Sequence, residues 1–413
     1  MLSLSMLARN EAGQIEAALA SVADFVDEMV VLDTGSTDDT VAIAERCGAV
    51  VHSIAWPGDF APARNRALEL VRGDWVLVLD ADERLRPEAR QPLLELMQQP
   101  DLLLVTLLRQ ELGAAQSPYS SVSRLFRRHG AIRWSRPYHA MVDDSVMALL
   151  AAEPHWRLAQ CPEPALLHTG YRPELLADGS KARRLRQAME ADLREHPGDP
   201  YASAKLGALL VEEGERAAGI ALLEQGLAQC PAGADPERFE LLLHLAIAHG
   251  AGSPDLAIPL YRQALALPLD PRLTLAARLN LAGLLLEAGA TGQSTGQASE
   301  QAREQASEEA ALLCREATTA APAIALAWSQ LGLVERRRGA IGAAINAYRR
   351  ALSLDPDHTP THQNLAVALL LGGDIPGCRA AFRQTIRLLE EQGRPEEARA
   401  LARQAATMVR LDD

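Results

Sequence analysis

The first part of the chain alternates between short apolar stretches and amphipathic ones. Residues 75–79 are apolar without interruption, which is typical of a strand that is buried on both faces of a sheet. Residues 59–71 instead carry apolar side chains at helical spacing. The same patterns predict further strands at 2–7, 29–32, 50–54, 102–108 and 166–171, and further helices at 12–22, at 38–47 and from Pro87 onward. This alternation predicts an α/β domain with a mostly parallel sheet that helices cover on both faces.

Polar segments follow three of the predicted strands, at the point where each strand ends. They are Arg-Asn-Glu at 9–11, Asp-Thr-Gly-Ser-Thr-Asp at 33–38 and Asp-Ala-Asp-Glu at 80–83. Because the carboxyl ends of parallel strands meet at one edge of a sheet, we expect the three segments to lie close together. In open α/β sheets this edge is where ligands bind.

The carboxylates of the third segment, Asp80 and Asp82, stand two positions apart. Alternate residues of an extended chain point the same way, so both side chains can aim at one point. Hard cations such as Mg²⁺ favour one or two carboxylates together with phosphate oxygens. The pair therefore predicts a divalent cation with a phosphorylated ligand. The alternative is a strand that ends in a solvated acidic turn, and an isolated Asp-x-Asp does not decide between them.

The second segment combines a turn with the start of a helix. Gly35 permits a tight turn, and the helix that begins near Asp38 offers free amide groups. Asp33 can accept hydrogen bonds from a base or a ribose. An ordinary strand-to-helix turn explains the same residues. The segment therefore indicates a ligand site only in combination with the other two segments.

Composition and charge narrow the classes of partner and compartment. Acidic residues outnumber basic ones by 54 to 41, and the net charge of −13 argues against a nucleic-acid partner. The five cysteines are scattered without metal-ligand spacing, which favours free thiols in a reducing cytosol. No apolar run approaches the ~20 residues that span a bilayer, and residues 1–7 are expected to form a strand instead of a signal peptide. We predict a cytoplasmic protein, either free or peripheral at the inner membrane.

From about residue 179 onward the strand signals stop, and a period of about 34 residues appears. The clearest unit carries small and large apolar residues at Trp328, Leu331, Gly332, Ala344, Tyr348, Ala351 and Pro356. Related spacings begin at Leu206, Leu245, Leu281 and Leu365. A Gly-, Gln- and Ser-rich insertion at about 290–306 interrupts the third unit, and we expect it to be a mobile loop.

Both parts of the chain resemble known families. The segments 9–11, 33–38, 59–65 and 79–83 resemble a family 2 glycosyltransferase of the GT-A fold, most of all the subgroup of bacterial β-glucosyltransferases and peptide-modifying relatives with appended helical repeats. The later units resemble tetratricopeptide repeats. The resemblances imply an α/β GT-A domain with a Rossmann-like, mostly parallel sheet at residues 1–178. They also imply an all-α tetratricopeptide-repeat superhelix at 179–413.

The glycosyltransferase resemblance also implies roles for individual residues. Arg9 and Glu11 would line the nucleotide pocket, and Asp33 would contact uracil or ribose. Arg64 and Asn65 would lie near the diphosphate. The full set implied to bind the nucleotide-sugar is Arg9, Asn10, Glu11, Asp33, Gly35, Ser36, Asp38, Arg64, Asn65, Asp80, Ala81 and Arg124.

The metal and the catalytic base are assigned in the same way. Asp82 would be the principal ligand of Mn²⁺ or Mg²⁺, and Asp80 and His168 would complete the site, with His139 as a competitor of His168. An inverting transfer also needs a carboxylate that takes the proton of the acceptor. The subgroup has His-Glu where this chain has His139-Ala140, so we favour Asp143 as the base, with Asp144 as the alternative.

The sequence thus predicts an inverting transfer of a sugar from a nucleotide-sugar, most simply a UDP-sugar, to a glycan, lipid-linked or peptide acceptor. The groove of the repeats would bind a protein partner or a second copy of the chain, or the repeats would only support the catalytic domain. Ala140 motivates an alternative, which is a non-catalytic interaction scaffold with a degenerate transferase domain. A nucleotidyltransferase is a third reading.

Overall fold

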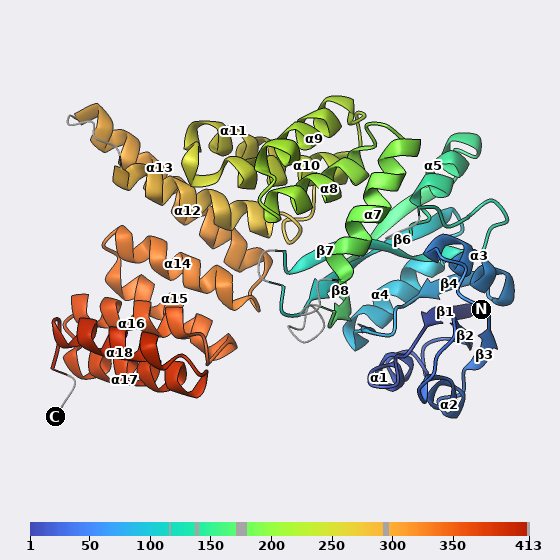
Figure 1. The fold of residues 1–413 in the computed structure, drawn as a ribbon, viewed down its shortest axis with the longest axis horizontal. Coiled ribbons are helices and arrows are strands. Elements are labelled where there is room, and N and C mark those ends of the chain that lie inside the picture. The colour runs from blue at the N-terminus through green and yellow to red at the C-terminus, as the bar shows by residue number, and fades with distance from the viewer. Residues whose placement is uncertain (115–116, 137–139, 171–179, 292–296, 411–413) are drawn as a thin grey trace. The chain divides into compact units, whose positions relative to one another are not determined.

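The computed structural model describes residues 1–114, 117–136, 140–170, 180–291 and 297–410. The chain divides into two compact units, Met1–Gly214 and Glu215–Asp413 (Figure 1). The domain boundary that was predicted at residue 178 lies outside the described residues and stays a prediction.

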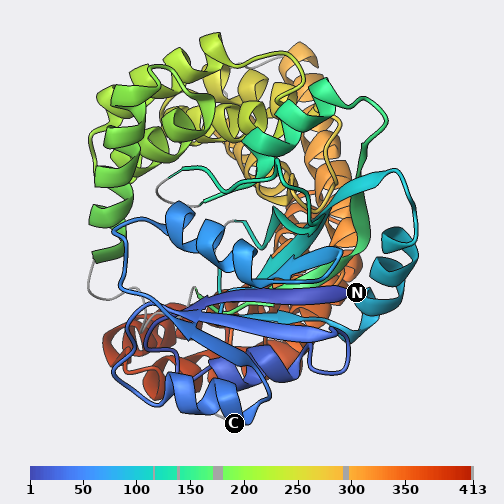
Figure 2. The same cartoon turned by 90° about the vertical axis from the view of Figure 1, so that its right-hand side faces the viewer.

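The first unit is built on an eight-stranded sheet. The strands are β1 (Leu2–Ala8), β2 (Glu28–Asp33), β3 (Val50–Ser53), β4 (Trp75–Val78), β5 (Glu83–Leu85), β6 (Leu102–Glu111), β7 (Tyr119–Arg127) and β8 (Arg157–His168), in the spatial order β3-β2-β1-β4-β7-β6-β8-β5. β3, β2, β1 and β4 are parallel neighbours, visible as the blue strands of Figure 2. β7 runs antiparallel between β4 and β6, β8 is parallel to β6, and β5 is antiparallel to β8.

The predicted α/β domain with a mostly parallel sheet is therefore confirmed. An antiparallel β7 between β4 and β6 leaves β6 and β8 in the same direction as β1, β2 and β4. All five strands consequently end at one edge of the sheet. The pattern at 119–127 did not predict β7, because polar residues interrupt this strand.

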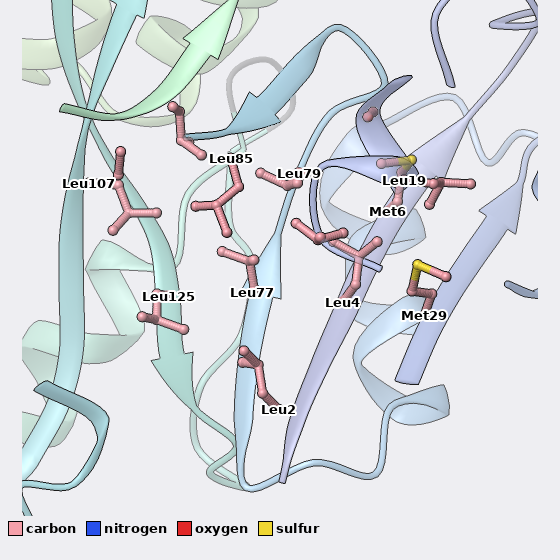
Figure 3. Packing of buried hydrophobic residues seen from close by; sticks show 14 of the residues in the cluster. Leu2, Leu4, Met6, Leu19, Met29, Leu77, Leu79, Leu85, Leu107 and Leu125 are labelled. Carbon is pink, nitrogen blue, oxygen red and sulfur yellow. The ribbon is translucent and has the colours of Figure 1, made fainter. Parts of the chain in front are cut away.

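Helices cover both faces of this sheet. They are α1 (Ile15–Ala20), α2 (Thr40–Arg46), α3 (Phe60–Leu70), α4 (Pro87–Met97) and α5 (Asp143–Ala152), with α7 (Ser180–Glu195) and α8 (Pro200–Glu212) later in the unit. On one face, Leu4 and Leu77 pack with Leu19 of α1, and the cluster extends to α4 (Figure 3). On the other face, side chains of β4 and β7 pack with those of α3 and α5. Successive strand residues serve opposite faces, which explains the uninterrupted apolar run at 75–79.

The second unit is helical. Its helices are α9 (Arg216–Gln229), α10 (Asp235–His249), α11 (Pro254–Leu265), α12 (Leu275–Thr291), α13 (Gln297–Ala320), α14 (Ala325–Arg337), α15 (Ile341–Leu354), α16 (Thr359–Leu371), α17 (Ile375–Glu391) and α18 (Pro395–Ala406), with a 3-10 turn at Gly250–Gly252. Consecutive helices pack in pairs, as in α14 with α15 and α16 with α17. No helix in the described part of the chain is long and apolar enough to span a membrane.

The structure differs from the sequence prediction at the insertion. Residues 297–306 were expected to belong to a mobile loop, but they form the first turns of α13. The last glycine of the insertion is Gly296, and the following residues are mostly Ala, Glu and Gln, which favour a helix. Residues 292–296 lie outside the described residues.

Candidate functional site

The candidate site lies at the edge of the sheet where the parallel strands β1, β2, β4, β6 and β8 end. The segments 9–11, 33–38 and 80–83 follow β1, β2 and β4 there, as the sequence predicted. β6 and β8 add Glu111 and His168, their last residues, at the same edge.

The first two loops are braced against each other. Asn10 has a left-handed backbone with φ of 57°. Its backbone N–H donates to Ser36 Oγ at 2.9 Å, and its Oδ1 accepts from the backbone N–H of Thr37 at 2.8 Å. Asp38 accepts from the backbone N–H of Ala12 at 3.2 Å. Asn10 and Ser36 are thus brought together as predicted, and Asp38 contacts the same loop through Ala12, so hydrogen bonds connect the two loops at several points.

Asp33 stabilises the turn that follows β2. Its side chain is buried, and its carboxylate accepts from the backbone N–H groups of Gly35 at 3.0 Å and Ser36 at 3.2 Å. Gly35 has φ of 101°, a conformation that side chains disfavour. These contacts occupy the carboxylate with its own loop. The expected contact of Asp33 with uracil or ribose stays a prediction.

Glu11 connects the first loop electrostatically to the third. Its side chain is half-buried, and Oε2 accepts from Gln14 Nε2 at 2.8 Å. Burial raises the pKa of Glu11, and the negative charges of Asp82 and Asp80 raise it further. Arg9 is exposed at the same edge. The carboxylates of the loop after β4 therefore act electrostatically on the loop after β1.

Asp80 is held by two arginines. Its Oδ1 accepts from Arg64 Nη2 and its Oδ2 accepts from Arg124 Nη2, both at 2.5 Å. Burial opposes ionisation of Asp80, but the positive charges of Arg124 and Arg64 outweigh it and hold the pKa of this carboxyl well below its usual range. The Asp80 carboxylate is thus the counter-ion of two buried guanidinium groups.

This arrangement differs from the expected metal site of Asp80 with Asp82. The strand ends at Val78, and the backbone N–H of Glu83 donates to the carbonyl of Asp80, so the segment is a turn and not an extended strand. The two aspartates therefore contact different partners. Within the described residues, no group of three or more His, Cys, Asp or Glu side chains could hold a metal ion. The side chain of Ala81 is buried in the apolar cluster, and its expected contact with the nucleotide-sugar stays a prediction.

A β-bulge directs Arg124 toward Asp80. In the pairing of β6 with β7, Val105 is opposite Leu125 and Thr106 is opposite Ser123, so Arg124 is one extra residue in its strand. Such bulges re-aim a side chain and are frequent beside active sites. The guanidinium of Arg124 is buried and also lies 3.5 Å from Glu83 Oε1.

Arg64 and Asn65 of α3 both contact Trp134. The guanidinium of Arg64 lies over the indole ring, 4.8 Å from its centroid. Asn65 Nδ2 donates to the Trp134 carbonyl at 2.9 Å, and the Trp134 N–H donates to Asn65 Oδ1 at 2.8 Å. Asn65 therefore fixes the backbone just before residues 137–139. These three residues, His139 among them, lie outside the described residues. The expected place of Asn65 near a diphosphate stays a prediction.

Asp82 and His168 face each other across the edge. His168 Nε2 lies 3.0 Å from Asp82 Oδ2, and the backbone N–H of Thr169 donates to the Asp82 carbonyl at 3.1 Å. Gly170 packs directly on this pair, since a Cβ there would lie 2.5 Å from His168 Nε2 and 2.8 Å from Asp82 Oδ2. Burial disfavours the charged ring, but hydrogen bonds to Asp82 and Glu111 outweigh it and raise the pKa of His168 to about 9.

The pair fits a divalent cation. Two ligand atoms that bind one Mg²⁺ at right angles, each about 2.1 Å from the ion, lie about 3.0 Å apart. A carboxylate oxygen and an imidazole nitrogen also suit Mn²⁺. Phosphate oxygens and water would supply the remaining ligands, which is how proteins commonly bind Mg²⁺ with substrate.

Two charged residues of this site, Glu111 and Arg109, were missed in the sequence. Glu111 Oε2 lies 2.5 Å from His168 Nδ1. Arg109 Nη1 donates to Glu83 Oε1 at 2.6 Å, and Arg109 Nε donates to Glu111 Oε1 at 2.8 Å. Glu83 and Glu111 are buried. The only signal was the change from apolar to charged residues at the end of β6, which resembles the change after β4.

Asp143 and Asp144 begin α5 in different environments. Asp143 accepts from Ser123 Oγ at 2.7 Å, and burial raises the pKa of its carboxyl. Burial also opposes ionisation of Asp144, but hydrogen bonds from Ser135 and Arg136 outweigh it and lower its pKa. Asp143 is thus the better proton acceptor of the two. Ala140, which replaces the expected glutamate, packs against the apolar cluster under α5.

Comparisons with known proteins agree with both parts of the fold. The family description "Glycosyl transferase family 2" matches residues 3–158, and "Tetratricopeptide repeat" matches residues 325–358. A TPR repeat-containing protein of Synechococcus elongatus is 43% identical over an alignment that covers 99% of this chain and 98% of that protein. The SPbeta prophage-derived glycosyltransferase SunS of Bacillus subtilis is 27% identical over 48% of this chain and 46% of its own length. An uncharacterized glycosyltransferase of Rickettsia felis is 45% identical over 21% of this chain and 30% of that protein.

Proposed function

We propose that this chain transfers a sugar from a nucleotide-sugar with inversion at the anomeric carbon. The chain belongs to the same family as the Synechococcus TPR repeat-containing protein, and it is a glycosyltransferase with a family 2 domain. The donor is a UDP-sugar, and the acceptor is a glycan, a lipid-linked sugar or a peptide. The observation that carries this proposal is the 3.0 Å approach of Asp82 Oδ2 to His168 Nε2 at the edge where the parallel strands end.

Asp82 and His168 would hold the divalent cation, Mn²⁺ or Mg²⁺. Bound there, it would neutralise the negative charge that develops on the leaving diphosphate. Arg64 and Arg124 support the same task, because Asp80 fixes two guanidinium groups in place before any ligand arrives. Arg9 and Glu11, on the loop after β1, line the side of the site that takes the nucleotide.

Asp143 is the proposed base. As the acceptor oxygen attacks the anomeric carbon, a new carbon–oxygen bond forms and the bond between sugar and phosphate breaks. The proton of the acceptor passes to the Asp143 carboxylate, and the electron pair of the broken bond leaves with the diphosphate. Burial and the raised pKa of Asp143 favour this role over Asp144, whose charge is neutralised by Arg136.

The repeats are proposed to bind a protein, which is either a polypeptide acceptor or a second copy of the chain. Stacked helix pairs of this kind present extended surfaces that suit polypeptides. We also propose a cytoplasmic location. None of the five cysteines, all of which lie among the described residues, forms a disulfide, which fits a reducing compartment.

A panel of donors tests the reaction. The purified full-length protein would be incubated with Mn²⁺ and UDP-glucose, UDP-galactose, UDP-N-acetylglucosamine or GDP-mannose, and release of UDP or GDP would be measured. We expect release from one donor, and loss of release in Asp82→Ala while the circular dichroism spectrum stays unchanged. No binding or hydrolysis of any donor would favour a non-catalytic scaffold. Pyrophosphate release from a nucleoside triphosphate and a sugar phosphate would favour a nucleotidyltransferase.

A further inference from the structure

Glu111 is the last residue of β6. Its side chain contacts the imidazole ring of His168, and the other side of this ring contacts Asp82. We propose that Glu111 is a positioning residue, which fixes the ring of His168 so that Nε2 faces Asp82 and a divalent cation bound beside it. This inference rests on the proposed function, since it concerns the cation of that reaction.

The sheet places Glu111 directly beside His168. In the pairing of β6 with β8, Glu111 is opposite His168, and in the pairing of β5 with β8, Glu83 is opposite the same residue. The backbone N–H of Leu112 donates to the His168 carbonyl at 2.9 Å, so the backbone itself holds this register. The 2.5 Å contact of Glu111 Oε2 with Nδ1 is therefore built into the sheet and does not depend on a flexible loop.

The other oxygen of Glu111 is anchored as well. Oε1 accepts from Arg109 Nε at 2.8 Å and from the hydroxyl of Ser120. Arg109 Nε also lies 3.1 Å from Ser120 Oγ. The Glu111 side chain is only 3% exposed, so water does not compete for these hydrogen bonds. These hydrogen bonds fix the orientation of the Glu111 carboxylate toward the imidazole of His168.

The chemistry of imidazole explains why this matters. A neutral histidine can bind a cation through either ring nitrogen, and a hydrogen bond at the other nitrogen decides which one. A cation bound beside Asp82 would take the place of the proton on Nε2. Glu111 would still accept the Nδ1 proton, so the Nε2 lone pair would be directed to that cation. Loss of a carboxylate that holds a metal-binding histidine in this way typically lowers the metal affinity about 10- to 100-fold.

The chain offers a mild substitution for the test. Glu111→Gln keeps the size of the side chain and an oxygen that can accept from His168, but it removes the charge. Arg109 keeps its ion pair with Glu83 in this variant, so no buried guanidinium loses its only partner. Glu95→Gln is the matched control, because Glu95 lies on the exposed side of α4 and contacts Gln91.

Isothermal titration of the full-length protein with Mn²⁺ tests the proposal. We expect the Kd to rise about 10- to 100-fold in Glu111→Gln and to stay unchanged in Glu95→Gln. In a His168→Ala background, Glu111→Gln should cause no further loss, because Glu111 acts through the ring. Equal Mn²⁺ affinity of wild type and Glu111→Gln would overturn this inference and would leave the proposed function intact.

Two further outcomes are separated by design. If the wild-type protein itself does not bind Mn²⁺, the metal-dependent reaction fails and this inference fails with it. If Glu111→Gln does not fold, Ser120→Ala decides, since it removes one hydrogen bond to Glu111 and leaves every charge in place. We expect a several-fold rise of the Mn²⁺ Kd in Ser120→Ala, and an unchanged Kd would overturn the proposal.

Discussion

Arg124 Nη2 lies 2.5 Å from Asp80 Oδ2, and it reaches this position because its strand carries one residue more than its neighbour. The same carboxylate binds Arg64 through its other oxygen. Two buried guanidinium groups therefore share one counter-ion. Without Asp80, Arg64 would lose the carboxylate that it contacts, and Arg124 would keep only Glu83, whose Oε1 lies 3.5 Å away.

Removal of Asp80 should thus destabilise the first unit. We expect Asp80→Ala to lower the free energy of unfolding by about 2 kcal/mol. This is below the roughly 3–5 kcal/mol for breaking fully buried pairs, because a third of the Asp80 side chain is exposed. Urea denaturation measures the change. Asp39→Ala is the control, since Asp39 is an exposed aspartate at the start of α2, and equal stability of the two variants would contradict the counter-ion role.

Gly170 permits the approach of Asp82 to His168. A methyl group at this position would lie 2.5 Å from His168 Nε2, so Gly170→Ala must displace one of the two side chains. We expect Mn²⁺ binding and donor hydrolysis to fall at least 10-fold, with the circular dichroism spectrum unchanged, as for loss of a ligand-positioning contact. Gly130→Ala is the matched control, because a Cβ at Gly130 meets no atom within 4 Å. Unchanged Mn²⁺ affinity in Gly170→Ala would exclude this pair as the metal ligands.

The pH profile of donor hydrolysis tests Asp143. Burial raises the pKa of Asp143, so the carboxylate loses its charge at a higher pH than an ordinary aspartate. If Asp143 is the base, the rate falls as the pH drops through this raised value. We expect Asp143→Asn to reduce the transfer rate roughly 10²- to 10⁴-fold and to remove this acid limb. Asp144→Asn, the control, should retain the limb.

Stability provides a second measurement on Asp143. Because its pKa is higher in the folded state, the folded protein binds the proton more tightly than the unfolded chain does. The contribution to stability is present at low pH and is lost as the pH rises through the folded pKa. Asp143→Asn should therefore be no less stable than wild type at pH 7. A large loss of stability would show that Asp143 serves the fold and would weaken its assignment as the base.

The sequence predicted the parallel part of the sheet and the edge where the site lies. Both follow from local signals, such as the apolar run of β4 and the polar segments after β1, β2 and β4. The two family resemblances were also correct, because motifs in fixed order carried them. The antiparallel β7 was not predicted, since the polar residues of its sequence hide the strand.

The contacts inside the site were mostly beyond the sequence. His168 was expected beside Asp82, and the structure brings the two together, but Glu111 acquires its role only through its register with β8. Asp80 and Asp82 were expected to converge because alternate strand residues share a face. That expectation depends on an extended chain, and the turn after Val78 removes the condition.

The repeats allow a comparison of two glycines inside helices. A Cβ at Gly332 of α14 would lie 2.5 Å from the ring of Tyr348 of α15, which is fully buried. Gly283 of α12 has no atom within 4 Å of such a Cβ. Gly332→Ala should therefore destabilise the repeats by about 1–3 kcal/mol through overpacking. Gly283→Ala should stabilise them by roughly 0.5–1 kcal/mol, because alanine favours the helix.

Thermal unfolding of the full-length variants measures both changes. The signal is the circular dichroism at 222 nm, which reports mainly on helices. The two substitutions are chemically identical and both lie in the middle of a helix, so the intrinsic preference for alanine has the same sign in each. Opposite shifts of the melting temperature would show that close contact between α14 and α15 requires glycine at position 332. Shifts of the same sign would contradict the packing of Tyr348 against this glycine, and with it the reason why small residues recur in the repeats.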